Sequence, residues 1–222
     1  MGFWQLDRAD QKEAMRSEYE QKSHGNPLDL NNAGDGLRSD AGRMRWQHSQ
    51  AQGQFQLDEI FLLDNQIMHG KAGYYVYLSF LLTGKHQQVL VNYGWVPAGS
   101  DRRVAPTLDF PQEETVITGV AKDVPSTGIK LAETTEEKLG NNIYRLQTLD
   151  LQTLAEKRNG ELLPYVLRLE APAPKGFFRD WPEPGFGKEK HLGYAFQWFA
   201  LATALVIIYL VVNVKKISND RD

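Results

Sequence analysis

The chain has 222 residues, a formal net charge of −3 and no cysteine. This length leaves room for one domain with a sizeable core, or for two small ones. The lack of cysteine excludes disulfides, thiolate metal sites and cysteine nucleophiles. The slightly negative charge and the lack of a long basic run give no support to nucleic-acid binding.

The first expected element is an N-terminal helix within residues 1–23. The segment WQLDRADQKEAMRSEYEQKS is rich in strong helix formers and contains no Gly or Pro. Its apolar positions are sparse, so we expect an exposed or interfacial helix. The next segment, HGNPLDLNNAGDGL, has the Gly, Asn, Asp and Pro content of a loop.

Residues 24–187 are expected to form a β-rich domain. Four segments rich in β-branched and aromatic residues predict strands: FQLDEIFLL, AGYYVYLSFLL, QQVLVNYGWVP and TVITGVAKDV. The turn segments DNQIMHG, TGKH and AGSDRR separate them. Short strands at this spacing are typical of an antiparallel meander or a small barrel, so the predicted fold is α+β with a β-rich antiparallel, barrel-like domain.

A helix and one more strand follow in the same domain. Asp150 is placed as the N-cap of a short helix, LQTLAEKRNG, which we expect to end at Gly160. LLPYVLRLEA predicts a strand, and Pro164 favours an edge position at that end of it.

The C-terminal segment predicts a transmembrane helix at residues 188–216, followed by a tail at 217–222. No Asp, Glu, Lys, Arg or His occurs from Gly193 to Val214. At about 1.5 Å per residue, roughly 22 such residues span about 33 Å, which matches a hydrocarbon core of about 30 Å. Lysines lie almost evenly on both sides, so the positive-inside rule does not decide the orientation.

The sequence gives no positive argument for an enzyme, since it lacks a nucleophile elbow, a P-loop, HExxH and a dinucleotide fingerprint. The residue that stands out is His191, directly before the apolar run. On a continuous helix it shares a face with Tyr194, Trp198 and Ala202. An imidazole at the water–lipid boundary could bind haem iron, with aromatic rings beside the porphyrin. The alternative is an interfacial histidine within an ordinary aromatic belt.

Several blocks, in order along the chain, resemble the Surfeit locus protein one family, which comprises assembly factors for haem–copper cytochrome oxidase. GFWQLDRADQK resembles the opening segment of the family, with Trp4 and Arg8 in the expected places. RDWPEPGFGKEKHLGYAFQWFALA resembles its closing motif, which contains His191. VLVNYGWVP resembles its strand signature, in which the matching residues are Asn92, Gly94 and Trp95.

This resemblance implies a protein that is not an enzyme, binds haem A transiently at the membrane face and aids its insertion into oxidase subunit I. It implies that His191 is the axial ligand of the haem iron, with Tyr194 and Trp198 beside the porphyrin. The implied partners are subunit I, other oxidase assembly factors and membrane lipid, with haem A synthase as a further candidate. The alternative is a scaffold that stabilises an assembly intermediate without binding haem.

Two points of the strand signature stay open. Tyr93 stands where the family usually has Arg. That Arg could contact a haem propionate or a partner protein, or it could form a structural salt bridge. The alternative to a functional role for Asn92, Gly94 and Trp95 is a structural one. In that case the glycine allows a turn and the tryptophan is a packed aromatic at the end of a strand.

The resemblance also bears on topology. The family has two spans flanking a domain on the periplasmic or intermembrane side, and its opening motif directly follows the first span. Here that motif begins at residue 2, so we expect a first transmembrane helix that is missing from this chain. The resemblance implies a multi-pass protein of the bacterial inner membrane, or of the mitochondrial inner membrane, with the β-rich domain external and residues 217–222 cytoplasmic.

Overall fold

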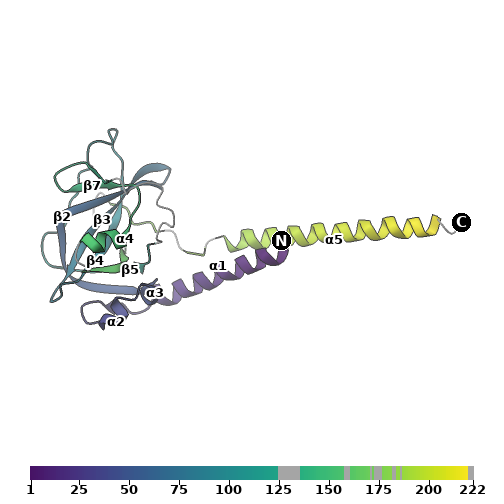
Figure 1. Ribbon diagram of the computed structural model, residues 1–222, viewed down its shortest axis with the longest axis horizontal. Helices are drawn as coiled ribbons and strands as arrows, with labels where there is room; N and C mark the ends of the chain where they lie inside the picture. Colours follow the sequence, from purple (N-terminus) through teal and green to yellow (C-terminus); the bar gives the residue numbers. More distant parts are fainter. Residues whose placement is uncertain are drawn as a thin grey trace. The chain divides into compact units, whose positions relative to one another are not determined.

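The chain forms a mixed sheet and a pair of long helices (Figure 1). The computed structural model describes residues 1–124, 136–157, 161–170, 172, 177–181, 184–185 and 187–219. The chain divides into two units. We call Met1–Glu20 with Pro182–Asp222 the helical unit, and Gln21–Trp181 the sheet unit.

The sheet unit is built around a closed set of strand pairings. Its strands are β1 (Leu28–Asp29), β2 (His48–Met68), β3 (Lys71–Leu82), β4 (Gln88–Pro97), β5 (Thr115–Lys122), β6 (Glu137–Lys138), β7 (Ile143–Leu146) and β8 (Leu162–Leu169). The order β3-β4-β8-β5-β2 returns to its start because β2 also pairs with β3. Such a closed circuit of hydrogen-bonded strands is the connectivity that a small barrel requires.

The predicted antiparallel sheet is only partly right, because the sheet is mixed. β2 pairs antiparallel with β3 and β5, as do β3 with β4 and β5 with β8. The pairs β4–β8, β2–β7 and β1–β2 are parallel. Parallel neighbours need a long crossover between them, and the chain from β4 to β8 supplies one by way of β5, β6, β7 and a helix.

The hairpin between β2 and β3 corrects one predicted turn. DNQIMHG was expected to be a turn, but β2 continues through most of it, and Met68 pairs with Lys71. The turn itself has only two residues, His69 (φ 49°) and Gly70 (φ 74°), and their positive φ values suit a tight hairpin. The polar residues before it form a β-bulge instead, where Asn65 also has a positive φ of 60°.

Three short helices, α2 (Asp35–Arg38), α3 (Ala41–Met44) and α4 (Leu151–Lys157), complete the described part of the sheet unit. The predicted N-cap of α4 is confirmed. Oδ1 of Asp150 accepts hydrogen bonds from the backbone N–H groups of Gln152 at 3.1 Å and Thr153 at 3.2 Å. The predicted end of this helix at Gly160 lies outside the described residues.

The two faces of the sheet bury different clusters of side chains. On β3, alternate residues from Tyr74 to Leu82 point into the main core. Tyr77 lies on the opposite face and packs in a second cluster with Leu154 of α4. At the start of β8, Pro164 has β4 on one side only, since β5 pairs with β8 from Val166 onward. This confirms the edge position predicted for that end.

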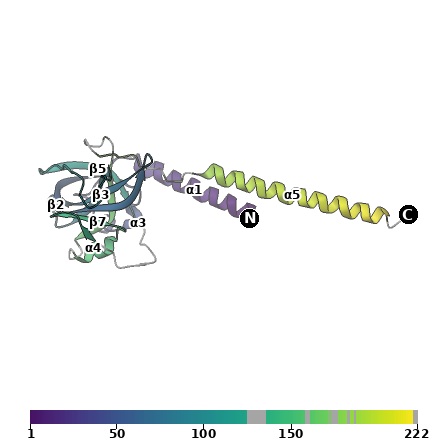
Figure 2. The same ribbon diagram turned by 90° about the horizontal axis from the view of Figure 1, so that it is seen from above.

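The helical unit pairs α1 (Gly2–Ser23) with the first turns of α5 (Lys188–Asn219), and both views show the two helices side by side (Figures 1 and 2). The ring centroids of Phe3 and Phe199 lie 5.2 Å apart. Nζ of Lys188 is 3.0 Å from the carboxylate of Glu13. Ala9 of α1 and Ala195 of α5 are both buried.

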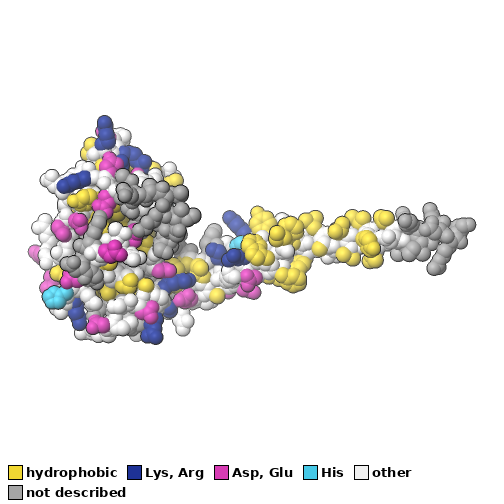
Figure 3. Space-filling model, in the orientation of Figure 1, with side chains coloured by type: hydrophobic (Ala, Val, Ile, Leu, Met, Phe, Trp, Pro, Cys, Tyr) yellow, Lys and Arg dark blue, Asp and Glu magenta, His cyan; other side chains and the backbone are white. Residues whose placement is uncertain are grey.

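One helix of the described chain, Lys188–Asn213, is long and apolar enough to cross a membrane. Its apolar side chains are almost all exposed, and Figure 3 shows them along α5. An apolar helix without a protein cover is what a lipid environment accommodates, because its backbone polar groups are satisfied internally. The helix is therefore consistent with a membrane-anchored protein.

Substituting Leu167 tests how far the sheet unit depends on β8. Leu167 is 0% exposed in the centre of this strand, and Leu167→Ala should lower the free energy of unfolding by about 2–5 kcal/mol, because it leaves a cavity in the core. The control is Val104→Ala, at a side chain that is 64% exposed, which should change it by less than about 0.5 kcal/mol. Urea unfolding of the full chain in detergent, followed by tryptophan fluorescence, measures both; equal effects would contradict the prediction.

Candidate functional site

His191 lies where α5 packs against α1. Its Nδ1 is 2.7 Å from Oε1 of Gln5, and the side chain is half-buried. An amide oxygen can only accept a hydrogen bond, so Nδ1 carries the proton and donates it. The lone pair of a neutral imidazole is then on Nε2. No residue in the described part of the chain pairs with that Nε2.

This hydrogen bond is the arrangement that prepares a histidine to bind a metal. Metal-binding histidines usually donate their other ring N–H to an oxygen, which fixes both the tautomer and the orientation of the ring. Gln5 fills that role for His191 from a position 186 residues earlier in the chain. The described residues contain no group of three or more His, Cys, Asp or Glu side chains that could hold a metal ion by themselves. Because a porphyrin supplies most of the ligands of its iron, a single imidazole is enough to bind a haem.

Tyr194 and Trp198 follow His191 on α5, and both are exposed. Ala195, between them in sequence, is buried in the helical unit. His191 thus stands at the border between the side of α5 that packs on α1 and an exposed aromatic side. The two aromatic rings are available to line a flat ligand or to lie at the lipid interface.

The two signature residues of α1 contact each other. The guanidinium carbon of Arg8 is 5.4 Å from the ring centroid of Trp4, one turn earlier, and Trp4 is exposed. Arg8 also donates to Oε1 of Gln11 at 2.8 Å. Sequence reasoning singled out Trp4 and Arg8 but gave no role to Gln5. The sequence feature that could have pointed to Gln5 is its position in the same opening segment as Trp4 and Arg8.

The residues of the strand signature on β4 make contacts that stabilise the fold. Gly94 has a φ of +142°, and an added Cβ would lie 3.0 Å from the backbone oxygen of Phe178. Asn92 is buried, donates to the hydroxyl of Tyr77 at 3.1 Å, and accepts from the backbone N–H of Gly94 at 3.2 Å. Trp95 exchanges two backbone hydrogen bonds of 2.8 Å with Phe178. These contacts match the structural alternative for the three residues.

Tyr93 is buried at the centre of an aromatic cluster. Its ring centroid lies 4.8 Å from that of Phe177, 5.1 Å from that of Phe110 and 5.4 Å from that of Phe55. A guanidinium is nevertheless present here, because that of Arg179 lies 5.0 Å from the ring centroid of Tyr93. Burial raises the pKa of the Tyr93 hydroxyl above its ordinary value, while the charge of Arg179 opposes that rise.

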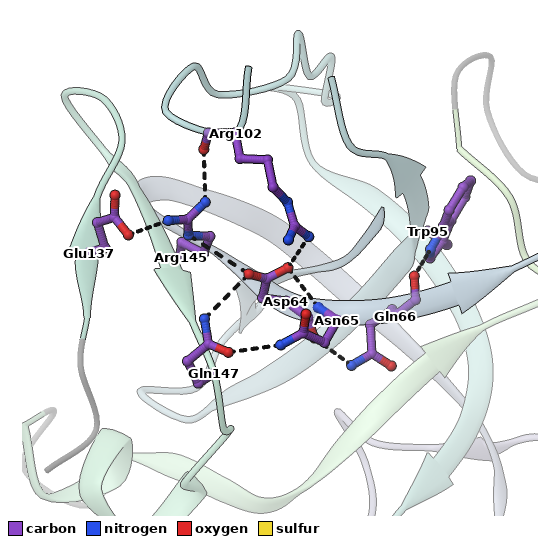
Figure 4. A network of polar contacts seen from close by, with 8 residues as sticks. All are labelled: Asp64, Asn65, Gln66, Trp95, Arg102, Glu137, Arg145 and Gln147. Atoms are coloured by element: carbon purple, nitrogen blue, oxygen red, sulfur yellow. Dashed lines mark hydrogen bonds and ion pairs between the residues drawn. The ribbon is translucent and has the colours of Figure 1, made fainter. Parts of the chain in front are cut away.

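Sequence reasoning missed a polar network around the buried carboxylate of Asp64 (Figure 4). Oδ1 of Asp64 accepts from Arg102 at 2.6 Å, and Nε of Arg145 lies 3.9 Å from Oδ2. Arg145 also donates to the backbone oxygen of Arg102 and pairs with Glu137. Gln147 contacts the same carboxylate at 3.3 Å. The network ties β2 to β6, β7 and the loop that follows β4.

The network reaches the strand signature through one further bond. Nε1 of Trp95 donates to the backbone oxygen of Gln66 at 2.9 Å, and the side chain of Gln66 donates to the backbone oxygen of Asp64 at 2.8 Å (Figure 4). No sequence motif marked Asp64, because it falls in a segment whose composition predicted a turn.

Comparison with known proteins gives two findings. A family model described as the SURF1 family matches residues 1–203. A protein of Rickettsia bellii (strain RML369-C), named SURF1-like protein, is 27% identical over 218 residues, which cover 95% of this chain and 84% of that protein.

Removal of the Asp64 carboxylate should destabilise the sheet unit. Asp64→Ala leaves Arg102 and Arg145 without a shared acceptor, and should lower the free energy of unfolding by about 2 kcal/mol. The matched control is Asp101→Ala, which breaks an exposed pair with Arg103 and should lower the free energy of unfolding much less than Asp64→Ala does. Urea unfolding measures the difference, and equal costs for the two variants would refute this role of the network.

Proposed function

The chain belongs to the SURF1 family, as its sequence blocks predicted, and we propose that it binds haem A at the membrane face and aids the insertion of that haem into oxidase subunit I. The family is one of assembly factors and is associated with the assembly of cytochrome oxidase. The finer steps, which are haem binding and delivery, are the content of the proposal.

The observation that carries the proposal is the hydrogen bond between His191 and Gln5. It orients the imidazole and leaves Nε2 as the coordinating atom. Bound haem would supply an iron that accepts an axial nitrogen ligand. Tyr194 and Trp198 would contribute exposed aromatic surface next to this ligand, and Gln5 would keep the ring in one tautomer.

One protein ligand suits delivery better than two. In this proposal, His191 supplies the one axial ligand that the described part of the chain gives to the iron. A haem held by one axial bond exchanges more readily than one held by two. No bond of the haem changes in this proposal, so it requires no catalytic group.

The location of the protein is part of the same proposal. A helix able to cross a membrane begins at Lys188, and His191 lies in its first turn. In this proposal the imidazole lies where a membrane surface would meet water. We propose that the sheet unit is on the outer side of a bacterial or mitochondrial inner membrane, that the protein is multi-pass, and that subunit I and other assembly factors are its partners.

The visible spectrum of the purified protein tests the proposal. Protein from cells that make haem A should carry a stoichiometric haem signal, and His191→Ala should lose it because the axial nitrogen is gone. The control is His69→Ala, at an exposed hairpin residue, which should keep the signal. If neither the native chain nor His191→Ala carries haem, the scaffold function, in which an assembly intermediate is stabilised without haem contact, replaces this proposal.

Gln5 gives a second and more specific test. Gln5→Leu removes the acceptor of the Nδ1 proton while leaving the ligand in place, and should weaken haem binding by about 10–100-fold. Gln21→Leu, at an exposed glutamine of the same helix, is the matched control and should bind as the native chain does. Titration of each apo-protein with haem, followed by its absorption, measures the affinities. Equal affinity in both variants would show that Gln5 does not orient the ligand.

A further inference from the structure

The end of β8 leaves a gap in the closed circuit of strands. β8 pairs with β4 up to Arg168 and with β5 up to Leu169. Beyond this point Trp95 of β4 pairs with Phe178 instead. On the other side of the gap, residues 115–117 of β5 pair with β2 but with no second strand among the described residues. Among the described residues, this part of β5 is therefore an open edge of an otherwise closed sheet.

The open edge presents backbone hydrogen-bonding groups. The C=O of Thr118 accepts from the N–H of Glu170 at 3.2 Å, so Thr118 directs its backbone groups to the β8 side. Alternate residues of a strand direct these groups to the same side. Val116 therefore presents both its N–H and its C=O to the gap, and its side chain is 55% exposed. Such an edge can accept an added strand.

A cavity of about 360 Å³ lies along this edge. Phe55, Tyr93 and Leu169 form apolar parts of its lining, and the residues 115–118 of β5 form one wall. This volume is near the lower end of the range of about 300–1,000 Å³ for ligand sites, and barrel mouths are frequent places for such sites. The cavity suits a segment of a few residues or a small molecule, and not a bulky domain.

Arg179 brings a positive charge to the cavity and is held rigidly there. Its Nε donates to the backbone oxygen of Tyr93 at 2.8 Å, and its Nη1 donates to the backbone oxygens of Glu170 at 2.7 Å and Pro172 at 3.3 Å. All three acceptors are neutral, and the carboxylate of Glu170 pairs with His48 at 3.1 Å. Burial lowers the pKa of Arg179 below its ordinary value, yet a guanidinium stays charged at neutral pH.

The charge of Arg179 has no carboxylate partner within the part of the chain that the structure describes. A half-buried guanidinium in a fixed position is a strong donor site for a carboxylate, because charged hydrogen bonds are roughly twice as strong as neutral ones. The nearby carboxylate of Glu170 disfavours a ligand with two negative charges, such as a phosphate monoester.

We propose that this cavity binds an extended peptide segment that carries a carboxylate, with the peptide backbone paired to Val116 and the carboxylate bound by Arg179. A peptide fits better than a free small acid because the open edge offers a donor and an acceptor in strand geometry. The cavity lies entirely within the sheet unit, so this inference is independent of the proposed haem site.

Binding of a labelled peptide pool tests the inference. The probe is a fluorescein-labelled pool of tetrapeptides in which each position is Val, Thr, Ile or Phe, with a free C-terminal carboxylate. Fluorescence anisotropy with the full chain in detergent should show binding, and the same pool with a C-terminal amide should bind about 10–100-fold more weakly, because the charged contact is lost. This comparison uses the native protein, so it does not depend on the folding of any variant.

Two pairs of variants assign the contacts. Arg179→Gln should weaken binding of the free-acid pool by a similar factor, whereas Arg103→Gln, at an exposed arginine outside the cavity, should not change it. Val116→Pro removes the N–H of the open edge without removing a β2 ladder bond, and should weaken binding several-fold. Val116→Thr keeps the N–H and should bind as the native chain does. Urea unfolding verifies that each variant is folded.

Four results would overturn the inference: no binding of the free-acid pool, equal binding of the acid and amide pools, equal binding by native protein and a folded Arg179→Gln variant, or displacement of the pool by acetate at equal concentration. The last result would define a simple anion site in place of a peptide site.

Discussion

The sheet unit depends on the double pairing of β8. This strand is parallel to β4 on one side and antiparallel to β5 on the other, so it joins two parts of the sheet that would otherwise be open edges. Its apolar residues are buried, and alternate ones enter the main core. Because β8 follows a long crossover, the circuit closes only late in the sequence. Beyond the end of β8, no described strand joins β4 to β5, and this leaves the gap beside Arg179.

The aromatic cluster around Tyr93 lies where the pairing of β4 with β8 ends. Here four aromatic rings and one guanidinium pack together, whereas elsewhere strand pairing holds the sheet closed. The glycine that follows Tyr93 lets Phe177 and Phe178 approach the backbone closely. Tyrosine at this position thus keeps a cation beside the strand, although the cation comes from a different part of the chain.

Much of the fold could be read from the sequence, because its signals are local. The helix-forming segment, the strands of alternating aromatic and β-branched residues, the Asp150 cap and the apolar C-terminal run each depend on neighbours a few residues away. The turn predicted at DNQIMHG is confined to the last two residues of that segment, His69 and Gly70. Bulges and hairpin turns use the same polar residues, and only pairing with β3 decides between them. The parallel pairs were missed because strand order is a long-range property.

The candidate site divides in the same way. His191 could be found from its position before the apolar run. Gln5 lies in the opening block that resembles the family, but only the packing of α1 against α5 shows that it is the partner of His191. The Asp64 network and the Arg179 contact also join residues that are far apart in sequence. These polar contacts are evident once the strand pairing is known, but no spacing rule in the sequence predicts which charged residues will contact each other.

The distance in sequence between Gln5 and His191 has a consequence for biosynthesis. Gln5 precedes the whole sheet unit in the sequence, and His191 follows it. The oriented imidazole therefore forms only after the sheet unit has been synthesised and α5 has met α1. A polypeptide released before residue 191 would lack the imidazole altogether, so the ability to coordinate a metal is acquired only after the sheet unit is made.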